Sequence, residues 1–156
     1  MKTASKAGKK PFGKGKFSRV KNVRYLSWED AFDVEFEDGQ IIVGEGLTAI
    51  KKGSSYLPFL SDSVTLAKFP SVMVDMGAVK FMCNGANVMR PGIRSFGDFE
   101  KGQIVCIQEE SQKKSLAVGR TLVSSEEMKQ MDKGIVIENL HYISDKYWEA
   151  KKSIKE

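Results

Sequence analysis

Small residues are concentrated between residues 77 and 94, where the chain reads GAVKFMCNGANVMRPGIR. Gly85, Ala86, Pro91 and Gly92 cannot block an approaching sugar-phosphate chain, and the backbone amides beside them can donate to phosphate oxygens. This segment therefore predicts a surface that accepts a phosphate backbone. Taken alone, the glycines equally suit turn geometry in any barrel.

Polar and charged side chains flank these small residues. Lys80, Arg90 and Arg94 can supply positive charge, and the plane of an arginine can stack on an unpaired base. Asn87 can donate and accept at a nucleotide edge or a 2′-hydroxyl, and the flexible thioether of Met89 suits a base-stacking floor. Ordinary structural alternatives are solvated charges for the cations, a bond within its own turn for Asn87 and core filling for Met89. Long basic side chains beside a glycine-lined strand favour RNA binding over a role as ordinary solvated charges.

Catalytic and metal-binding patterns are weak. His141 is the single histidine, and its spacing from serine and cysteine implies no nucleophile. Cys83 and Cys106 are the two cysteines, too few for a disulfide framework or a four-ligand zinc site from one chain, and both are expected in the core. We therefore expect no reaction, no metal and no cofactor.

The length and composition fit one or two small compact units, because the chain has 156 residues of which 41% are hydrophobic. No apolar run approaches the roughly 18 residues that a membrane span needs. The lysines near the N-terminus lack the apolar segment of a signal peptide. We expect a cytoplasmic protein that is not associated with a membrane.

The net charge of +5 is unevenly distributed along the chain. Nine basic residues precede the first acidic one, Glu29, which leaves residues 25–156 with 16 basic and 20 acidic side chains and a net charge of −4. Residues 1–18 have too few apolar side chains to offset the cost of ordering, so we expect a flexible tail. Such an arm can hold a polyanion by counterion release, or can simply keep the protein soluble.

The elements that must position these residues indicate an α+β fold. Residues 19–73 are predicted to form a small α+β domain, in which Phe32, Val34 and Phe36 alternate with acidic residues as in a half-buried strand. Strands are expected over 20–27, 31–37 and 40–44 with a hairpin turn at 38–39, followed by a short helical or irregular piece over 47–52, a short helix before Pro70 and a strand over 71–74.

Residues 74–156 are predicted to form a compact β-barrel with a C-terminal helix. Asp75 can start a helix that lies within 77–84 and ends at Asn84 or Gly85. Strands are expected over 87–89, 103–108, 115–122 and 135–143, a helix capped by the SSEE motif at 124–127, and a final helix capped by Asp145. The apolar side chains of the first of these helices are expected to pack in the core, namely Val79, Phe81 and Met82.

These motifs resemble those of a known family. The segment VDMGAVKFMCNGANVMRPGI, followed by SLAVGRT and KGIVIENLHYISD, resembles a PUA domain, the pseudo-barrel appended to pseudouridine synthases and archaeosine transglycosylases. Upstream, the order of hairpin, YLPFL, short helix and KFP resembles the translation factors of the malignant-T-cell-amplified and ligatin type, including their archaeal relatives.

The resemblance implies a groove between the first helix of the PUA domain and the following strand and loop. The end of an RNA stem, or a single-stranded tail such as the CCA end of tRNA, is placed in such a groove. The RNA-binding residues that we expect are Gly77, Lys80, Gly85, Ala86, Asn87, Met89, Arg90, Pro91, Gly92 and Arg94, with Gly134 and Val136 on the opposite wall.

We therefore expect a non-catalytic protein that recognises the tRNA acceptor end or small-subunit rRNA in translation initiation or ribosome recycling. The expected partners are tRNA or rRNA, the small ribosomal subunit and an initiation-factor-like protein. One alternative is a detached PUA recognition subunit of a tRNA-modifying enzyme such as an archaeosine transglycosylase. Another is a protein-interaction module that uses the N-terminal sheet.

Overall fold

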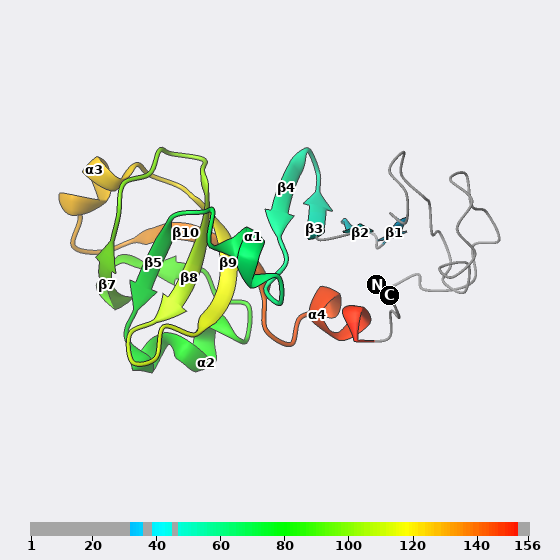
Figure 1. Ribbon diagram of the computed structural model, residues 1–156. Coiled ribbons are helices and arrows are strands. Elements are labelled where there is room, and N and C mark those ends of the chain that lie inside the picture. Colours follow the sequence, from blue (N-terminus) through cyan, green and yellow to red (C-terminus); the bar gives the residue numbers. More distant parts are fainter. Residues whose placement is uncertain (1–31, 36–38, 45–46, 153–156) are drawn as a thin grey trace. The chain divides into compact units, whose positions relative to one another are not determined.

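The computed structural model describes residues 32–35, 39–44 and 47–152 (Figure 1). The chain divides into two compact units, of which the first takes the residues up to Asp62 together with those from Lys146, and the second is Ser63–Asp145. This division differs from the expected one at residues 73 and 74, and it assigns the C-terminal helix to the first unit. The expected strand over 20–27 and the lysine-rich segment 1–18 lie outside the described residues.

An antiparallel sheet forms the first unit, with its described strands in the order β1-β2-β3-β4. The strands are β1 (Phe32–Glu35), β2 (Gln40–Gly44), β3 (Leu47–Lys52) and β4 (Ser55–Pro58). The prediction of a helical or irregular piece over 47–52 was wrong, because Ile50 pairs with Ile41 on one side and Leu57 on the other, and all three are buried. A local pattern cannot show these cross-strand partners.

The C-terminal helix α4 (Lys146–Lys151) packs within this first unit. The ring of Trp148 stacks on that of Phe59 with centroids 6.1 Å apart, and Tyr147 is buried. Gly39 permits the close approach, because a Cβ there would lie 2.5 Å from the Tyr147 hydroxyl oxygen. Aromatic burial therefore explains why α4 belongs with the N-terminal sheet.

A six-stranded mixed sheet forms the second unit, in the order β6-β10-β9-β8-β5-β7 among the described residues. Its strands are β5 (Ser71–Val74), β6 (Val88–Met89), β7 (Ile93–Phe96), β8 (Ile104–Glu109), β9 (Ser115–Thr121) and β10 (Ile135–Tyr142). The apolar side chains of these strands build one core, which includes Val72, Val74, Val88, Val105, Ile107, Leu116, Val136 and Ile137. The predicted α+β architecture with a C-terminal barrel is confirmed.

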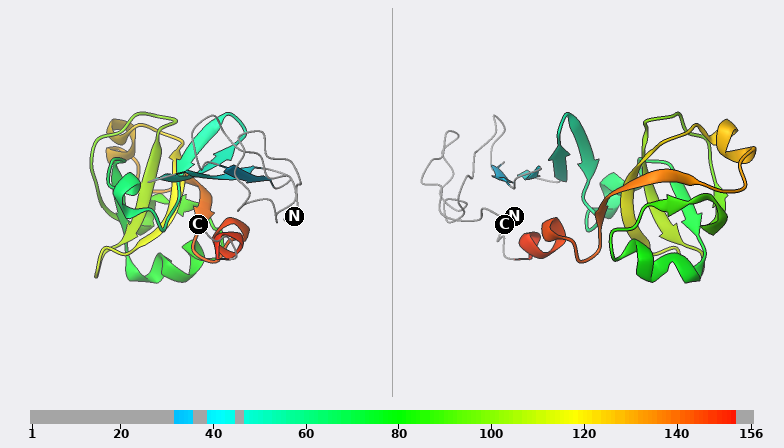
Figure 2. Two further views of the ribbon diagram at one scale, coloured as in Figure 1. Left: turned by 45° about the vertical axis from the view of Figure 1, so that its right-hand side comes forward. Right: turned by 180° about the vertical axis from the view of Figure 1, so that it is seen from behind.

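Short helices connect the strands of this unit, beginning with α1 (Ser63–Leu66). Asp75 Oδ1 accepts from the Ala78 amide at 3.0 Å and starts the 3-10 turn η2 (Met76–Ala78), which continues into α2 (Val79–Met82). A capping box of Ser124 and Glu127 starts α3 (Ser125–Lys129), as predicted. The views in Figures 1 and 2 place α2 and α3 at opposite ends of the barrel.

His141 has a structural role at the end of β10. Its side chain is buried, and Nδ1 lies 2.8 Å from Oδ2 of Asp145, which also accepts from the Tyr142 amide at 2.9 Å. The Asp145 carboxylate therefore holds the turn after β10, and its role as the cap of the last helix stays a prediction. None of the described helices is long and apolar enough to cross a membrane.

Candidate nucleic-acid interface

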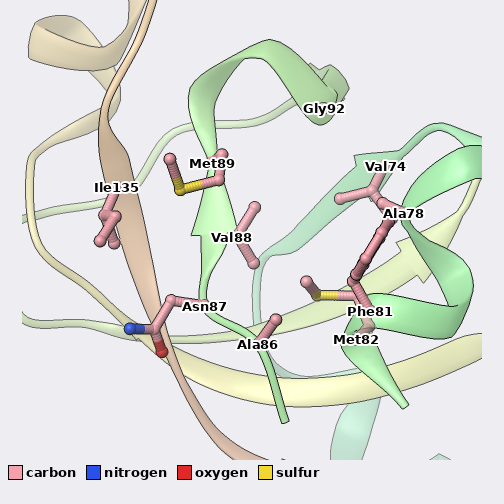
Figure 3. Close-up of a pocket in the computed structure, with 10 residues that line it drawn as sticks. All are labelled: Val74, Ala78, Phe81, Met82, Ala86, Asn87, Val88, Met89, Gly92 and Ile135. Atoms are coloured by element: carbon pink, nitrogen blue, oxygen red, sulfur yellow. The ribbon is translucent and has the colours of Figure 1, made fainter. Parts of the chain in front are cut away.

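A groove of about 450 Å³ opens in the second unit between α2 and β6. Figure 3 shows the α2 residues along one side of it and the β6 residues along the other. The residues that line this α2–β6 groove are Val74, Ala78, Phe81, Met82, Ala86, Asn87, Val88, Met89, Gly92 and Ile135. Nine of these ten residues have no polar side-chain group. The groove therefore suits a ligand with a flat apolar surface better than a small ion.

Large apolar side chains stand exposed at the rim of the groove. Phe81 is 56% exposed, Met89 48% and Ile135 47%. The prediction that Phe81 belongs to the core was wrong, because α2 is one short turn and turns this ring outward, whereas Met82 is buried as expected. Exposed apolar side chains that gather at one groove typically mark an interaction site, whereas single exposed apolar residues are common on protein surfaces.

Four of the expected contact residues line the groove, namely Ala86, Asn87, Met89 and Gly92. Gly85 lies beside them with a φ of +92°, a backbone conformation that favours glycine, and a Cβ there would lie 3.1 Å from the Tyr142 ring. Gly77, in η2, and Pro91, in the 3-10 turn η3 (Arg90–Gly92), are exposed next to these elements. The structure therefore brings most of the small residues together.

The three expected cations have different surroundings. Lys80 is exposed on α2, with Nζ 5.9 Å from the centre of the Phe81 ring at the rim. Arg90 is half-buried, donates from Nε to the Met128 carbonyl at 2.9 Å and covers the Phe96 ring at 5.4 Å. Lys80 is thus the cation beside the groove, and Arg90 ties η3 to α3.

Arg94 lies between two carboxylates. Its guanidinium nitrogens are 3.7 Å from Asp75 Oδ2 and 3.6 Å from Glu110 Oε1, and the side chain is 57% exposed. Glu110 also accepts from the Met76 amide at the start of η2. The positive charge of Arg94 is therefore partly balanced in this structure.

Strand β10 supplies the opposite wall through a different residue from the one expected. Ile135 lines the groove, whereas Val136 is fully buried in the core. Gly134, with a φ of +103°, accepts from the Arg90 amide at 2.8 Å. The pairing of β10 with β6 shifts register between Ile135 and Ile137, and such an irregularity is not visible in the sequence pattern.

Asn139 is a positioning residue that the sequence did not single out. Its Nδ2 donates to the carbonyls of Met82 at 3.1 Å and Ala86 at 3.0 Å, and its backbone amide donates to Asn87 Oδ1. Asn87 was expected to bond either RNA or its own turn, and in the structure its Oδ1 accepts from strand β10. An asparagine within a strand gives no sequence signal for that role.

Nucleophilic and metal chemistry find little support at the described residues. Burial raises the pKa of the Cys106 thiol and of the Cys83 thiol, so both are protonated at neutral pH. The described part of the chain contains no group of three or more His, Cys, Asp and Glu residues that could hold a metal ion.

The mixed barrel, with a groove between α2 and β6, has the architecture of a PUA-type barrel. The family model for the PUA domain matches residues 70–143. A hypothetical protein of Pyrococcus horikoshii has a similar crystal structure, with a TM-score of 0.68, 31% identity and coverage of 77% of this chain and 78% of that one.

Curated relatives refine this class. An uncharacterized protein of Methanocaldococcus jannaschii is 40% identical over 71% of this chain and 70% of its own length. Translation machinery-associated protein 20 of Schizosaccharomyces pombe is 45% identical over 53% of this chain, and malignant T-cell-amplified sequence 1 of Rattus norvegicus is 38% identical over 60%. The chain belongs to the family of PUA-domain proteins that includes these archaeal and eukaryotic relatives. It spans about half the length of these two eukaryotic relatives, 48% and 56%.

Proposed function

We propose that this protein binds RNA through the α2–β6 groove, as a component of the translation machinery, and catalyses no reaction itself. One observation carries the proposal, which is the exposure of Phe81, Met89 and Ile135 around an apolar groove with the Lys80 ammonium beside it. The apolar side chains can cover the face of a base while the lysine contacts a phosphate.

The groove suits an unpaired base better than a duplex. In a duplex the faces of the bases already stack on each other, so an apolar wall gains little from contact with them. A single-stranded end or a splayed loop exposes those faces, and stacking on a protein side chain is worth about 1–3 kcal/mol per base. The ligand that we propose is the acceptor end of tRNA or an unpaired segment of small-subunit rRNA.

The relatives give the cellular setting that we propose. Translation machinery-associated protein 20, which is named for that setting, shares 36–45% identity with parts of this chain in three fungi. A role in initiation or in ribosome recycling, with the small ribosomal subunit and an initiation-factor-like protein as partners, fits both this setting and an RNA-gripping groove.

The test is a binding titration with a labelled RNA stem that ends either blunt or in a single-stranded 3′ tail. Phe81→Ala should weaken binding of the tailed RNA about tenfold, since one stacked base is worth about 1–3 kcal/mol. Val64→Ala is the matched control, because Val64 is 71% exposed on α1 and lies outside the groove. Equal affinity of the wild type, Phe81→Ala and Met89→Ala for the tailed RNA would contradict the groove assignment.

Placement in translation needs a separate measurement. Sedimentation of the tagged protein with small ribosomal subunits supports it, and that association should weaken in the Phe81→Ala variant. A stable complex with a tRNA-modifying enzyme, without association with ribosomal subunits, would contradict it and support the recognition-subunit alternative.

A further inference from the structure

A further pocket, of about 340 Å³, lies within the second unit between the α1 segment and the sheet. Val105 and Ile107 of β8 point into the core, so the residues that alternate with them face the other side, towards α1. We call this the α1–β8 pocket. Its walls include Leu66 and Phe69 from the α1 segment, Ser71, Gln108 and Ser115 from the sheet, and Lys113 from the β8–β9 hairpin.

The sheet side of the α1–β8 pocket is polar, unlike the α2–β6 groove. Ser71 lies opposite Cys106, and Gln108 lies opposite Ser115, so their side chains share one face. The Cys106 thiol donates to Ser115 Oγ at 3.4 Å. In the described part of the chain, the half-buried side chains of Ser71 and Gln108 form no hydrogen bond. One hydroxyl and one amide are therefore available to a ligand.

The β8–β9 hairpin holds a cation at the same pocket. Lys113 has a φ of +59°, a conformation that residues other than glycine rarely adopt. Its amide donates to the Glu109 carbonyl at 3.1 Å, and the Glu109 carboxylate accepts from the Ser111 and Gln112 amides at 2.6 and 2.9 Å. These bonds fix the turn. Among the described residues, no carboxylate pairs with the Lys113 ammonium, which leaves its charge for an anion.

The size and the mixed lining of the pocket define a class of ligand. Small-molecule pockets take roughly 300–1,000 Å³, so this pocket suits a small molecule and is larger than one phosphate ion needs. An apolar ligand would leave the Gln108 amide without a partner, at a cost in free energy. A nucleotide meets all three demands, because its base has a flat face and a polar edge and its phosphate is an anion. The amide of a glutamine donates and accepts in one plane, as the edge of adenine does.

We propose that the α1–β8 pocket binds a single adenine nucleotide, with the base between Phe69 and Gln108 and the phosphate at Lys113. The nucleotide comes either from a free ribonucleoside monophosphate or from an unpaired position of a bound RNA. The RNA source rests on the proposed function, whereas the free nucleotide does not. None of the residues that line the α2–β6 groove takes part.

The experiment follows the backbone amide signals of the full chain by nuclear magnetic resonance during titration with AMP. Saturable shifts should appear at Ser71, Gln108 and Ser115, and they should persist in Phe81→Ala. Adenosine and inorganic phosphate should each bind at least about tenfold more weakly, because each lacks one of the two recognised parts. Equal affinity for AMP and inorganic phosphate would show an anion site without base recognition and would overturn the proposal.

Substitutions separate the two contacts. Lys113→Gln should weaken AMP binding about tenfold, because it removes a charge-assisted contact with the phosphate. Gln108→Leu should weaken binding of AMP and leave that of inorganic phosphate unchanged. Lys114→Gln is the matched control, since Lys114 is the next residue of the same hairpin and is exposed, but does not line the pocket. Equal losses in Lys113→Gln and Lys114→Gln would overturn the phosphate assignment.

A second titration, with a stem whose single-stranded tail contains adenosine, distinguishes the sources of the nucleotide. Pocket shifts with this RNA identify the RNA as a source, and pocket shifts with AMP alone identify the free nucleotide. If neither ligand shifts the pocket amides while Phe81→Ala weakens binding of the tailed stem, the pocket is overturned and the groove stands. If AMP shifts the pocket amides and Phe81→Ala leaves RNA binding unchanged, the pocket stands and the groove assignment falls.

Discussion

The backbone amide of Asn139 donates a hydrogen bond of 3.0 Å to Oδ1 of Asn87, 52 residues earlier in the chain. The side-chain amide of the same Asn139 donates to the carbonyls of Met82 and Ala86. One residue of β10 therefore fixes both the end of α2 and the start of β6, which are the two sides of the groove. Asn139 thus joins the two sides of the α2–β6 groove, although it is not among the lining residues.

The first prediction concerns the stability that Asn139 provides. Asn139→Ala leaves the carbonyls of Met82 and Ala86 without this donor and should lower the free energy of unfolding by about 2 kcal/mol. Asn87→Ala removes the side-chain acceptor of the Asn139 amide and should cost about 1 kcal/mol. Urea unfolding measures both values. A smaller loss for Asn139→Ala than for Asn87→Ala would contradict the bridging role.

Local sequence patterns predicted the elements whose causes are local. Asp75 at the start of η2, the capping box of Ser124 and Glu127, and the left-handed Gly85 each depend on residues within a few positions, and all three were found as expected. The small residues Ala86 and Gly92 also line the groove, as expected. Helix caps and glycine turns can be predicted from the spacing of residues alone.

Features that depend on distant pairing were missed. β3 is a strand because Ile41 and Leu57 flank Ile50, and Ile135 reaches the groove because β10 shifts register against β6. Phe81 was expected in the core because an apolar residue on a helix is usually buried, but α2 covers only Val79–Met82. These outcomes are set by tertiary contacts, which no window of local sequence contains.

The second prediction separates the roles of two cations that the sequence had grouped. Arg90→Ala removes the bond to the Met128 carbonyl and the contact with the Phe96 ring, so it should destabilise the protein by about 1–2 kcal/mol. Lys80→Ala should leave stability unchanged and weaken RNA binding, because Lys80 is exposed beside the groove. Paired unfolding and RNA titrations measure the difference. Loss of stability in Lys80→Ala alone would reverse the assignment.

The third prediction concerns acid stability and Glu109. Hydrogen bonds from the backbone amides, chiefly Gln112 and then Lys114 and Ser111, hold the pKa of this carboxyl below its ordinary value of 4.5. Because the folded pKa is depressed, the stabilisation is present above pH 4.5 and is lost as pH falls through the folded value. Glu109→Gln should therefore lower Tm at pH 7 and lower it less at pH 3.

Glu100→Gln is the control for that measurement, because Glu100 is an exposed carboxyl outside the β8–β9 turn. Thermal unfolding followed by circular dichroism at both pH values is sufficient. A Tm difference between Glu109→Gln and the wild type that stays constant from pH 7 to pH 3 would show that the carboxylate charge does not stabilise the β8–β9 turn.

The fourth prediction separates electrostatic attraction from recognition. Residues 1–18 contain six lysines and no acidic residue, and each phosphate contact contributes about 0.7 to the slope of log K against log salt for single-stranded RNA. If these lysines contact phosphates, removal of residues 1–18 should make the slope shallower by up to about 4 while the preference for tailed over blunt stems is kept. The preference is kept because base stacking in the groove depends on Phe81 and Met89, whose contacts are apolar and insensitive to salt. An unchanged slope would assign the lysine-rich segment to solubility, and a lost preference would show that the segment itself recognises the RNA end.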